Sequence, residues 1–143
     1  TVALKKIAIL GFSFKANTND TRESPAIDIV KDLLENGAEI MISDPKVTSE
    51  QISKDLNQTE DQKEMNYDVG SWQFSHDIYQ AVVNADAVVL LTEWDEYKYL
   101  DWERISKKMR APSWVFDARS IANKKEIKKA GINFWAIGNG SIN

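Results

Sequence analysis

The chain has 143 residues, of which 43% are hydrophobic and 28% charged, and its formal net charge is −4. These values are typical of one soluble globular domain, the acidic balance argues against a nucleic-acid-binding surface as the main function, and no apolar run approaches the roughly 20 residues of a membrane-spanning helix. The absence of cysteine excludes disulfides, thiolate metal ligands and cysteine nucleophiles within this chain, and we expect a cytoplasmic protein.

The hydrophobic pattern predicts strands that alternate with helices. Residues 6–10 are continuously apolar from Ile7, as in a strand buried on both faces of a parallel sheet. Ser24 and Pro25 then indicate a helix start, because serine is a favoured N-cap and proline fits the first helical turn; Gly37 is placed to cap its end. Further strands are predicted at 39–43, 72–74, 87–91, 114–116 and 134–136, and further helices near 48–56, 77–84, 101–109 and 124–130.

This alternation predicts a single α/β domain over residues 1–143. We expect a Rossmann-like open parallel sheet with helices on both faces, in three layers. Residues 46–71 are polar, with only scattered apolar side chains. We predict that the second half of this segment, near 57–70, is an exposed and mobile connection.

Cationic side chains follow two of the predicted strands. Lys15 and Arg22 come after the first strand, and Arg119 comes after the strand at 114–116. Because ligands of open parallel sheets bind beyond the carboxyl ends of the strands, we expect these cations at one edge. Together with the aromatic residues Phe14 and Trp94, they predict a site for an anionic ligand with a flat ring.

The loop after the first strand differs from a glycine-rich dinucleotide cradle, which needs three glycines, because it contains only Gly11. Binding would therefore rely on side chains, with Lys15 as a point charge and Arg22 or Arg119 as a bidentate fork.

Simpler interpretations compete with each of these assignments. Arg119 could pair with Asp117 or Glu93, Trp94 could be core packing, and the lysine pairs at 107–108, 124–125 and 128–129 are typical of solvated helix faces. The sequence shows no nucleophile–base arrangement, carboxylate pair or metal-ligand spacing that would indicate catalysis.

Several motifs occur in an order that resembles a known family. They are Lys5–Lys15 (KKIAILGFSFK), Thr18, Asp20–Pro25 (DTRESP), Ser43–Val47 (SDPKV), Ala85–Trp94 (ADAVVLLTEW), Asp101–Ile105 (DWERI) and Phe116–Arg119 (FDAR). With these motifs the chain resembles the C-terminal UDP-binding domain of the UDP-glucose/GDP-mannose dehydrogenase family, and more closely its UDP-glucose 6-dehydrogenase branch. The matches extend over nearly the whole chain.

The resemblance implies a role for each matched site residue. Phe14 and Lys15 would contact the UDP-sugar, Arg119 would bind the UDP moiety, and Arg22 would reach NAD held by another domain. One position departs from the pattern: Ala118 stands where the family usually has glycine, which adds a methyl group next to Arg119.

The family enzyme oxidises UDP-glucose to UDP-glucuronate with two NAD, and it needs an N-terminal NAD domain and a central helical region with a catalytic cysteine. The resemblance therefore implies an excised domain that is inactive alone, from a full-length enzyme that forms a homo-oligomer. Two alternatives stay open: a related dehydrogenase acting on UDP-N-acetylmannosamine or GDP-mannose, and a non-catalytic assembly module that meets a partner through residues 57–70.

Overall fold

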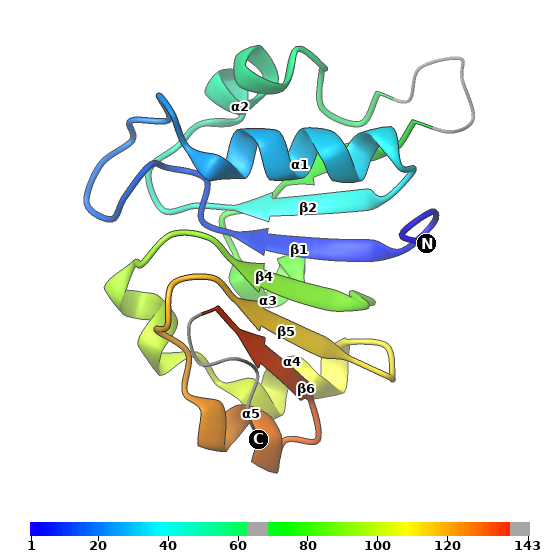
Figure 1. Cartoon of the computed structure of the whole chain (residues 1–143), viewed down its shortest axis with the longest axis vertical. Coiled ribbons are helices and arrows are strands. Elements are labelled where there is room, and N and C mark those ends of the chain that lie inside the picture. The colour runs from blue at the N-terminus through cyan, green and yellow to red at the C-terminus, as the bar shows by residue number, and fades with distance from the viewer. Residues whose placement is uncertain (63–68, 138–143) are drawn as a thin grey trace.

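A six-stranded sheet forms the centre of the computed structural model, which describes residues 1–62 and 69–137 (Figure 1). The strand order is β3-β2-β1-β4-β5-β6, and each neighbouring pair is parallel. The strands are β1 Lys6–Leu10, β2 Glu39–Ser43, β3 Ser71–Phe74, β4 Ala87–Leu90, β5 Trp114–Asp117 and β6 Asn133–Ala136. The predicted open parallel sheet is confirmed, with each strand within one or two residues of its expected bounds.

Helices cover both faces of the sheet and complete three layers. In Figure 1, α1 lies in front of the β2 and β3 side of the sheet, whereas α3, α4 and α5 lie behind the sheet. The α-helices are α1 Pro25–Glu35, α2 Ser49–Leu56, α3 Ile78–Ala81, α4 Trp102–Lys108 and α5 Lys124–Lys129. A 3-10 helix, η1 (Asp95–Tyr99), follows β4 and was not expected from the sequence, because so short an element has no hydrophobic period.

The central strand β1 explains the continuous apolar run at the start of the chain. Ala8 and Leu10 pack into the core on the α3–α5 side, whereas Ile7 and Ile9 pack into the core on the α1–α2 side. Because each face of the strand is buried, both alternating sets of side chains must be apolar. The sheet is therefore fixed most firmly at its centre, where β1 pairs with β2 and β4.

The start of α1 is tied to the loop that follows β1. Ser24 caps the helix by accepting a hydrogen bond from the backbone nitrogen of Ala26 at 3.2 Å, as its position before Pro25 predicts. The same hydroxyl donates to the carbonyl oxygen of Phe12 at 2.8 Å. One buried side chain thus fixes the helix and the preceding loop relative to each other.

The described start of the connection between α2 and β3 is anchored to β3. The indole nitrogen of Trp72 donates to the carbonyl oxygen of Gln58 at 2.9 Å, and the backbone nitrogen of Asp61 donates to the carbonyl oxygen of Trp72 at 2.7 Å. Residues 63–68 lie outside the described residues, so the mobility predicted for 57–70 stays a prediction.

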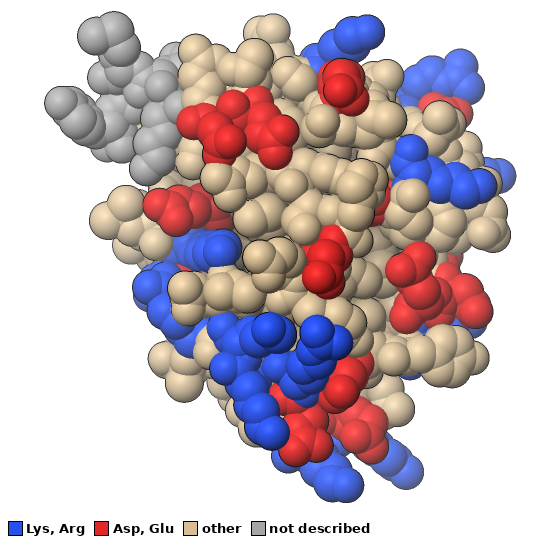
Figure 2. Space-filling model, turned by 180° about the vertical axis from the view of Figure 1, so that it is seen from behind, with Lys and Arg blue, Asp and Glu red and all other residues tan. Residues whose placement is uncertain are grey.

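Charged side chains gather on the outer surface of α4 and α5. Figure 2 views the molecule from the side opposite to that of Figure 1 and shows lysine and arginine gathered over the lower part of this face. Lys107, Lys125, Lys128 and Lys129 are exposed, as predicted for solvated helix faces. None of the described helices is long and apolar enough to cross a membrane.

Candidate functional site

The carboxyl ends of β1 and β4 form the point at which the strand order reverses. The chain moves from β1 outward to β2 and β3, then returns to β4 on the other side of β1 and continues to β5 and β6. Figure 1 shows the arrowheads of the strands directed to the same edge, where the loops after β1, β4 and β5 meet. In open α/β sheets this switch point is where ligands bind.

The loop after β1 approaches the end of β4 closely. Gly11 has a φ of +98°, and a Cβ atom at this position would lie 2.5 Å from the Cβ of Thr92. The Thr92 hydroxyl donates to the carbonyl oxygen of Ser13 at 2.9 Å, and the backbone nitrogen of Phe14 donates to the carbonyl oxygen of Asp20 at 2.7 Å. The loop that carries Lys15 is therefore ordered by its own backbone and by β4.

A buried carboxylate organises the same loop from the side of β2. Asp44 is 1% exposed, and its Oδ2 atom accepts hydrogen bonds from the backbone nitrogens of Phe12 at 2.8 Å and Ser13 at 3.1 Å. Its Oδ1 atom accepts from Lys46 and Val47 at 2.8 and 2.9 Å. No role was expected for Asp44 from the sequence. The available signal was an acidic residue directly after a strand, where backbone N–H groups of the next loop need acceptors.

Glu93 connects the loop of Lys15 to Arg119. Its Oε1 atom accepts a hydrogen bond from the backbone nitrogen of Ala16 at 2.8 Å, and its Oε2 atom pairs with the Nη2 atom of Arg119. The interpretation in which Arg119 pairs with Glu93 is thus confirmed. Lys15 and Arg119 belong to one edge of the sheet, as the strand-end argument predicts, and one carboxylate joins their loops.

Asp117 shapes the loop after β5 through its backbone contacts. It is 1% exposed and accepts hydrogen bonds from the backbone nitrogens of Arg119 at 2.9 Å, and of Ile121 and Ala122 at 2.8 Å each. Its carboxylate is therefore occupied by the main chain, while the guanidinium of Arg119 is paired with Glu93.

Arg22 is held differently from Arg119. Its Nε and Nη2 atoms form a two-point pair with Asp20 at 3.0 and 2.8 Å, and its side chain is 88% exposed. Hydrogen bonds from the side chain and backbone of Arg22 lower the pKa of Asp20 to about 2, and the charge of Lys15 contributes to the same shift. Arg22 is therefore an exposed cation of the loop that forms an ion pair with the nearby Asp20.

The two aromatic candidates, Phe14 and Trp94, differ in their exposure. Phe14 is 45% exposed beside Lys15, so its ring is available to a ligand at the carboxyl edge. Trp94 is 6% exposed and belongs to the core on the α3–α5 side. The interpretation of Trp94 as core packing is confirmed, and this tryptophan leaves the list of ligand-facing side chains.

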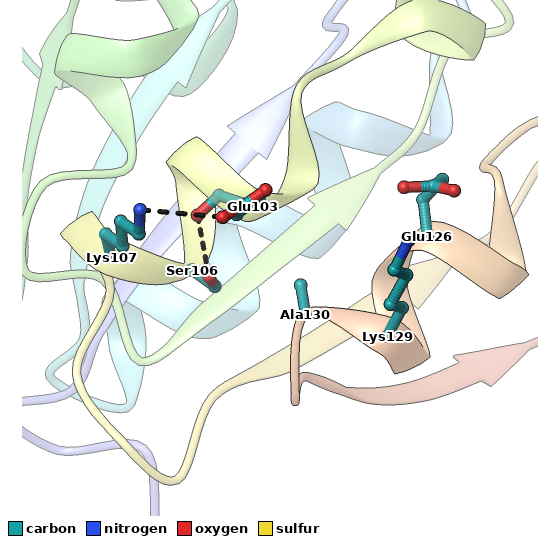
Figure 3. A pocket seen from close by; sticks show the side chains of 6 residues that line it. All are labelled: Glu103, Ser106, Lys107, Glu126, Lys129 and Ala130. Carbon is teal, nitrogen blue, oxygen red and sulfur yellow. Dashed lines mark hydrogen bonds and ion pairs between the residues drawn. The ribbon is translucent and has the colours of Figure 1, made fainter.

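A hollow of about 360 Å³ lies between α4 and α5 (Figure 3). Its charged lining residues are of both signs, and one pair is internal: the Lys107 ammonium lies 3.5 Å from the Glu103 carboxylate. Figure 3 shows this pair on α4, facing Glu126 and Lys129 of α5. The hollow belongs to the outer helix layer, so it lacks the convergent loops and strand ends that favour the carboxyl edge as the ligand site.

Comparison with known proteins identifies relatives of the chain. The family described as the UDP-glucose/GDP-mannose dehydrogenase family, UDP binding domain, matches residues 8–124. The chain is 43% identical over 150 residues to UDP-glucose 6-dehydrogenase 4 of Arabidopsis thaliana and 40% identical over 157 residues to UDP-glucose 6-dehydrogenase 3 of Oryza sativa subsp. japonica. Each match covers 96% of this chain but 30% of the relative. The chain thus spans about a third of the length of these relatives.

Two known structures share the fold of this chain. The structure of a UDP-D-ManNAc dehydrogenase from Pyrococcus horikoshii matches 99% of this chain and 27% of its own chain, with a TM-score of 0.71 and 28% identity. A UDP-glucose dehydrogenase from Pyrobaculum islandicum matches 97% of this chain and 26% of its own, with a TM-score of 0.64 and 23% identity, and this likeness supports the fold alone.

Proposed function

The chain belongs to the UDP-glucose/GDP-mannose dehydrogenase family, as its C-terminal UDP-binding domain, and from this premise we propose that it binds UDP-glucose for an NAD-dependent UDP-glucose 6-dehydrogenase. The observation that carries the proposal is the joining of the Lys15 and Arg119 loops by Glu93 at the switch point of the sheet. Among the nucleotide sugars of the family, UDP-glucose is favoured because relatives of 40% identity or more carry that name.

The proposed binding chemistry is electrostatic and uses side chains in place of a glycine-rich cradle. A diphosphate carries the negative charge that Lys15 and Arg119 complement, and Phe14 offers an exposed ring to a flat or apolar part of the ligand. Arg119 uses one Nη2 contact with Glu93, which leaves further guanidinium N–H groups for a phosphate. Because the loop backbone is already ordered, the loop itself loses little conformational entropy on binding.

The cofactor of the proposed reaction is NAD, which accepts hydride when it is bound by the full-length enzyme. Arg22 suits a role toward NAD held by another domain, because its side chain is 88% exposed and projects from an ordered loop. The chain contains no cysteine, so the covalent chemistry of the family would come from the remainder of the enzyme. A cytoplasmic location and a homo-oligomeric full-length enzyme belong to the same proposal.

Removing either cation tests the site assignment. In a full-length dehydrogenase carrying this domain, Lys15→Ala and Arg119→Ala are each expected to raise the KM for UDP-glucose about 10- to 100-fold, because each deletes a charge-assisted hydrogen bond to phosphate. We expect a smaller change in kcat, since the lost contacts exist before and during the reaction. Steady-state kinetics with UDP-glucose as the varied substrate measures both constants.

Lys128→Ala is the matched control, because it removes one exposed positive charge from the last turn of α5, which leads to the amino end of β6 at the opposite edge of the sheet. Its KM is expected to equal that of the unmodified enzyme. If Lys15→Ala and Arg119→Ala both retain the original KM and kcat, the assignment of this site is wrong.

A further inference from the structure

Glu93 accepts hydrogen bonds from two segments that are far apart in the sequence. Its Oε1 atom binds the backbone nitrogen of Ala16, the residue directly after Lys15, and its Oε2 atom binds the guanidinium of Arg119. Glu93 itself follows β4, whose end lies between the ends of β1 and β5 in the sheet. One carboxylate therefore spans the gap between the two loops that carry the cations.

The side chain is suited to this bridging role by its charge state and its length. A carboxylate offers two acceptor oxygens and no donor, so it can serve an N–H group on each side at once. The pair of Glu93 and Arg119 is about one-third exposed, with exposed fractions of 31% and 36%. Ion pairs that water still reaches contribute little to stability, so the fold alone gives no strong reason for this arrangement.

We propose that Glu93 is a positioning residue for diphosphate binding, which holds Arg119 and the Lys15–Ala16 backbone in the arrangement that receives the ligand. This inference rests on the proposed function, because it assumes that Lys15 and Arg119 bind the diphosphate. Without Glu93, the long Arg119 side chain regains rotamer freedom and the Ala16 backbone loses its partner. Both must then be ordered again when the ligand binds, which weakens binding.

A competing effect has the opposite sign. Glu93 also places a negative charge near the proposed diphosphate and occupies part of the Arg119 guanidinium, so its removal could strengthen anion binding. Partial exposure screens this repulsion. Two substitutions separate the effects: Glu93→Gln removes the charge and replaces one acceptor with a donor, whereas Glu93→Asp keeps the charge but is one methylene too short to reach both partners.

The test is a titration of the 143-residue chain and its variants with UDP, followed by amide NMR. Both Glu93→Gln and Glu93→Asp are expected to raise the Kd for UDP about five- to tenfold, a range typical of one lost ordering contact. In both ligand-free variants, the Ala16 amide should exchange faster with solvent. The control is Asp95→Asn, which alters a side chain that is 80% exposed and pairs with Lys98, and it should leave both readouts unchanged.

Making the Glu93→Gln substitution in a chain that already carries Arg119→Ala shows whether Glu93 acts through this arginine. If it does, Glu93→Gln raises the Kd by a smaller factor in this background than in the unmodified chain. The dispersed amide spectrum of each variant establishes that it is folded. Unchanged or tighter UDP binding by both Glu93 variants would overturn the positioning role alone. An unmodified chain that shows no UDP-dependent shifts at millimolar UDP would instead overturn the proposed function, and this inference with it.

Discussion

Replacing Asp44 with alanine is expected to lower the free energy of unfolding by about 4 kcal/mol, near the upper end of single-substitution effects. The carboxylate accepts four backbone hydrogen bonds, from Phe12, Ser13, Lys46 and Val47. Asp44 is 1% exposed and its partners Phe12 and Ser13 are buried, so water cannot replace the lost acceptor. Each buried donor left without a partner costs about 1–3 kcal/mol. Urea denaturation followed by circular dichroism measures the change.

Asp101→Ala provides the control for this substitution. Asp101 is exposed and accepts one backbone hydrogen bond, from Arg104 at the start of α4, so its loss should cost about 1 kcal/mol. Equal losses for Asp44→Ala and Asp101→Ala would contradict the account, because they would mean that the buried carboxylate holds no more than an ordinary helix cap. If Asp44→Ala does not fold, Asp44→Asn keeps one acceptor oxygen and should show an intermediate loss.

Gly11→Ala is expected to lower the free energy of unfolding by about 3 kcal/mol, from two separable causes. The φ of +98° is unfavourable for any residue with a Cβ, which accounts for about 1 kcal/mol. The rest comes from overlap, because the new Cβ would lie 2.5 Å from the Cβ of Thr92 and 2.7 Å from its backbone nitrogen. Relief of this overlap requires the loop after β1 to move away from β4, which would also displace Lys15.

Gly131→Ala measures the loss of stability that comes from the positive φ alone. Gly131 has a φ of +81°, but a Cβ there would meet no atom within 4 Å, so the substitution should cost about 1 kcal/mol. Thermal or urea unfolding of both variants gives the difference that belongs to overlap. Matching losses at Gly11 and Gly131 would show that the close approach between the first loop and β4 is not rigid.

The order of strands and helices could be predicted from the sequence because local signals agree with the fold. The apolar run at Ile7–Leu10 requires burial on both faces, and β1 indeed lies between two cores. Ser24 and Pro25 mark the start of α1, and the alternation of elements implies a parallel sheet. The 3-10 helix at Asp95–Tyr99 escaped prediction, since its geometry depends on how the chain leaves β4 and packs Tyr97 into the core.

The site could be located from the sequence, but its internal connections could not. Strand-end reasoning brings Lys15 and Arg119 to one edge, because parallel strands share the direction of their carboxyl ends. The sequence offered the Arg119–Glu93 pair and the burial of Trp94 as alternatives but could not select them, and it gave no sign of the contact between Glu93 and the Ala16 backbone. These features depend on where side chains of three separate loops point, and the spacing of residues in the sequence does not determine such long-range contacts.

The pairing of Arg22 with Asp20 shows the same limit in a local case. Two residues that are close in sequence can form a two-point ion pair only if the loop turns between them, and the sequence does not specify this turn. The structure therefore divides the cations into Arg119, which shares a carboxylate with the Lys15 loop, and Arg22, which is exposed and paired with Asp20 of its own loop. This division supports separate roles for them in the proposed enzyme.

A crystal structure of the chain with bound UDP would show whether Lys15 and Arg119 hold the diphosphate. We expect the diphosphate at the carboxyl edge of β1, β4 and β5, within about 3 Å of the Lys15 ammonium and the Arg119 guanidinium. Glu93 would still accept the hydrogen bond from the Ala16 nitrogen in that complex. UDP bound in the hollow between α4 and α5, with Lys15 and Arg119 free of ligand, would contradict the account.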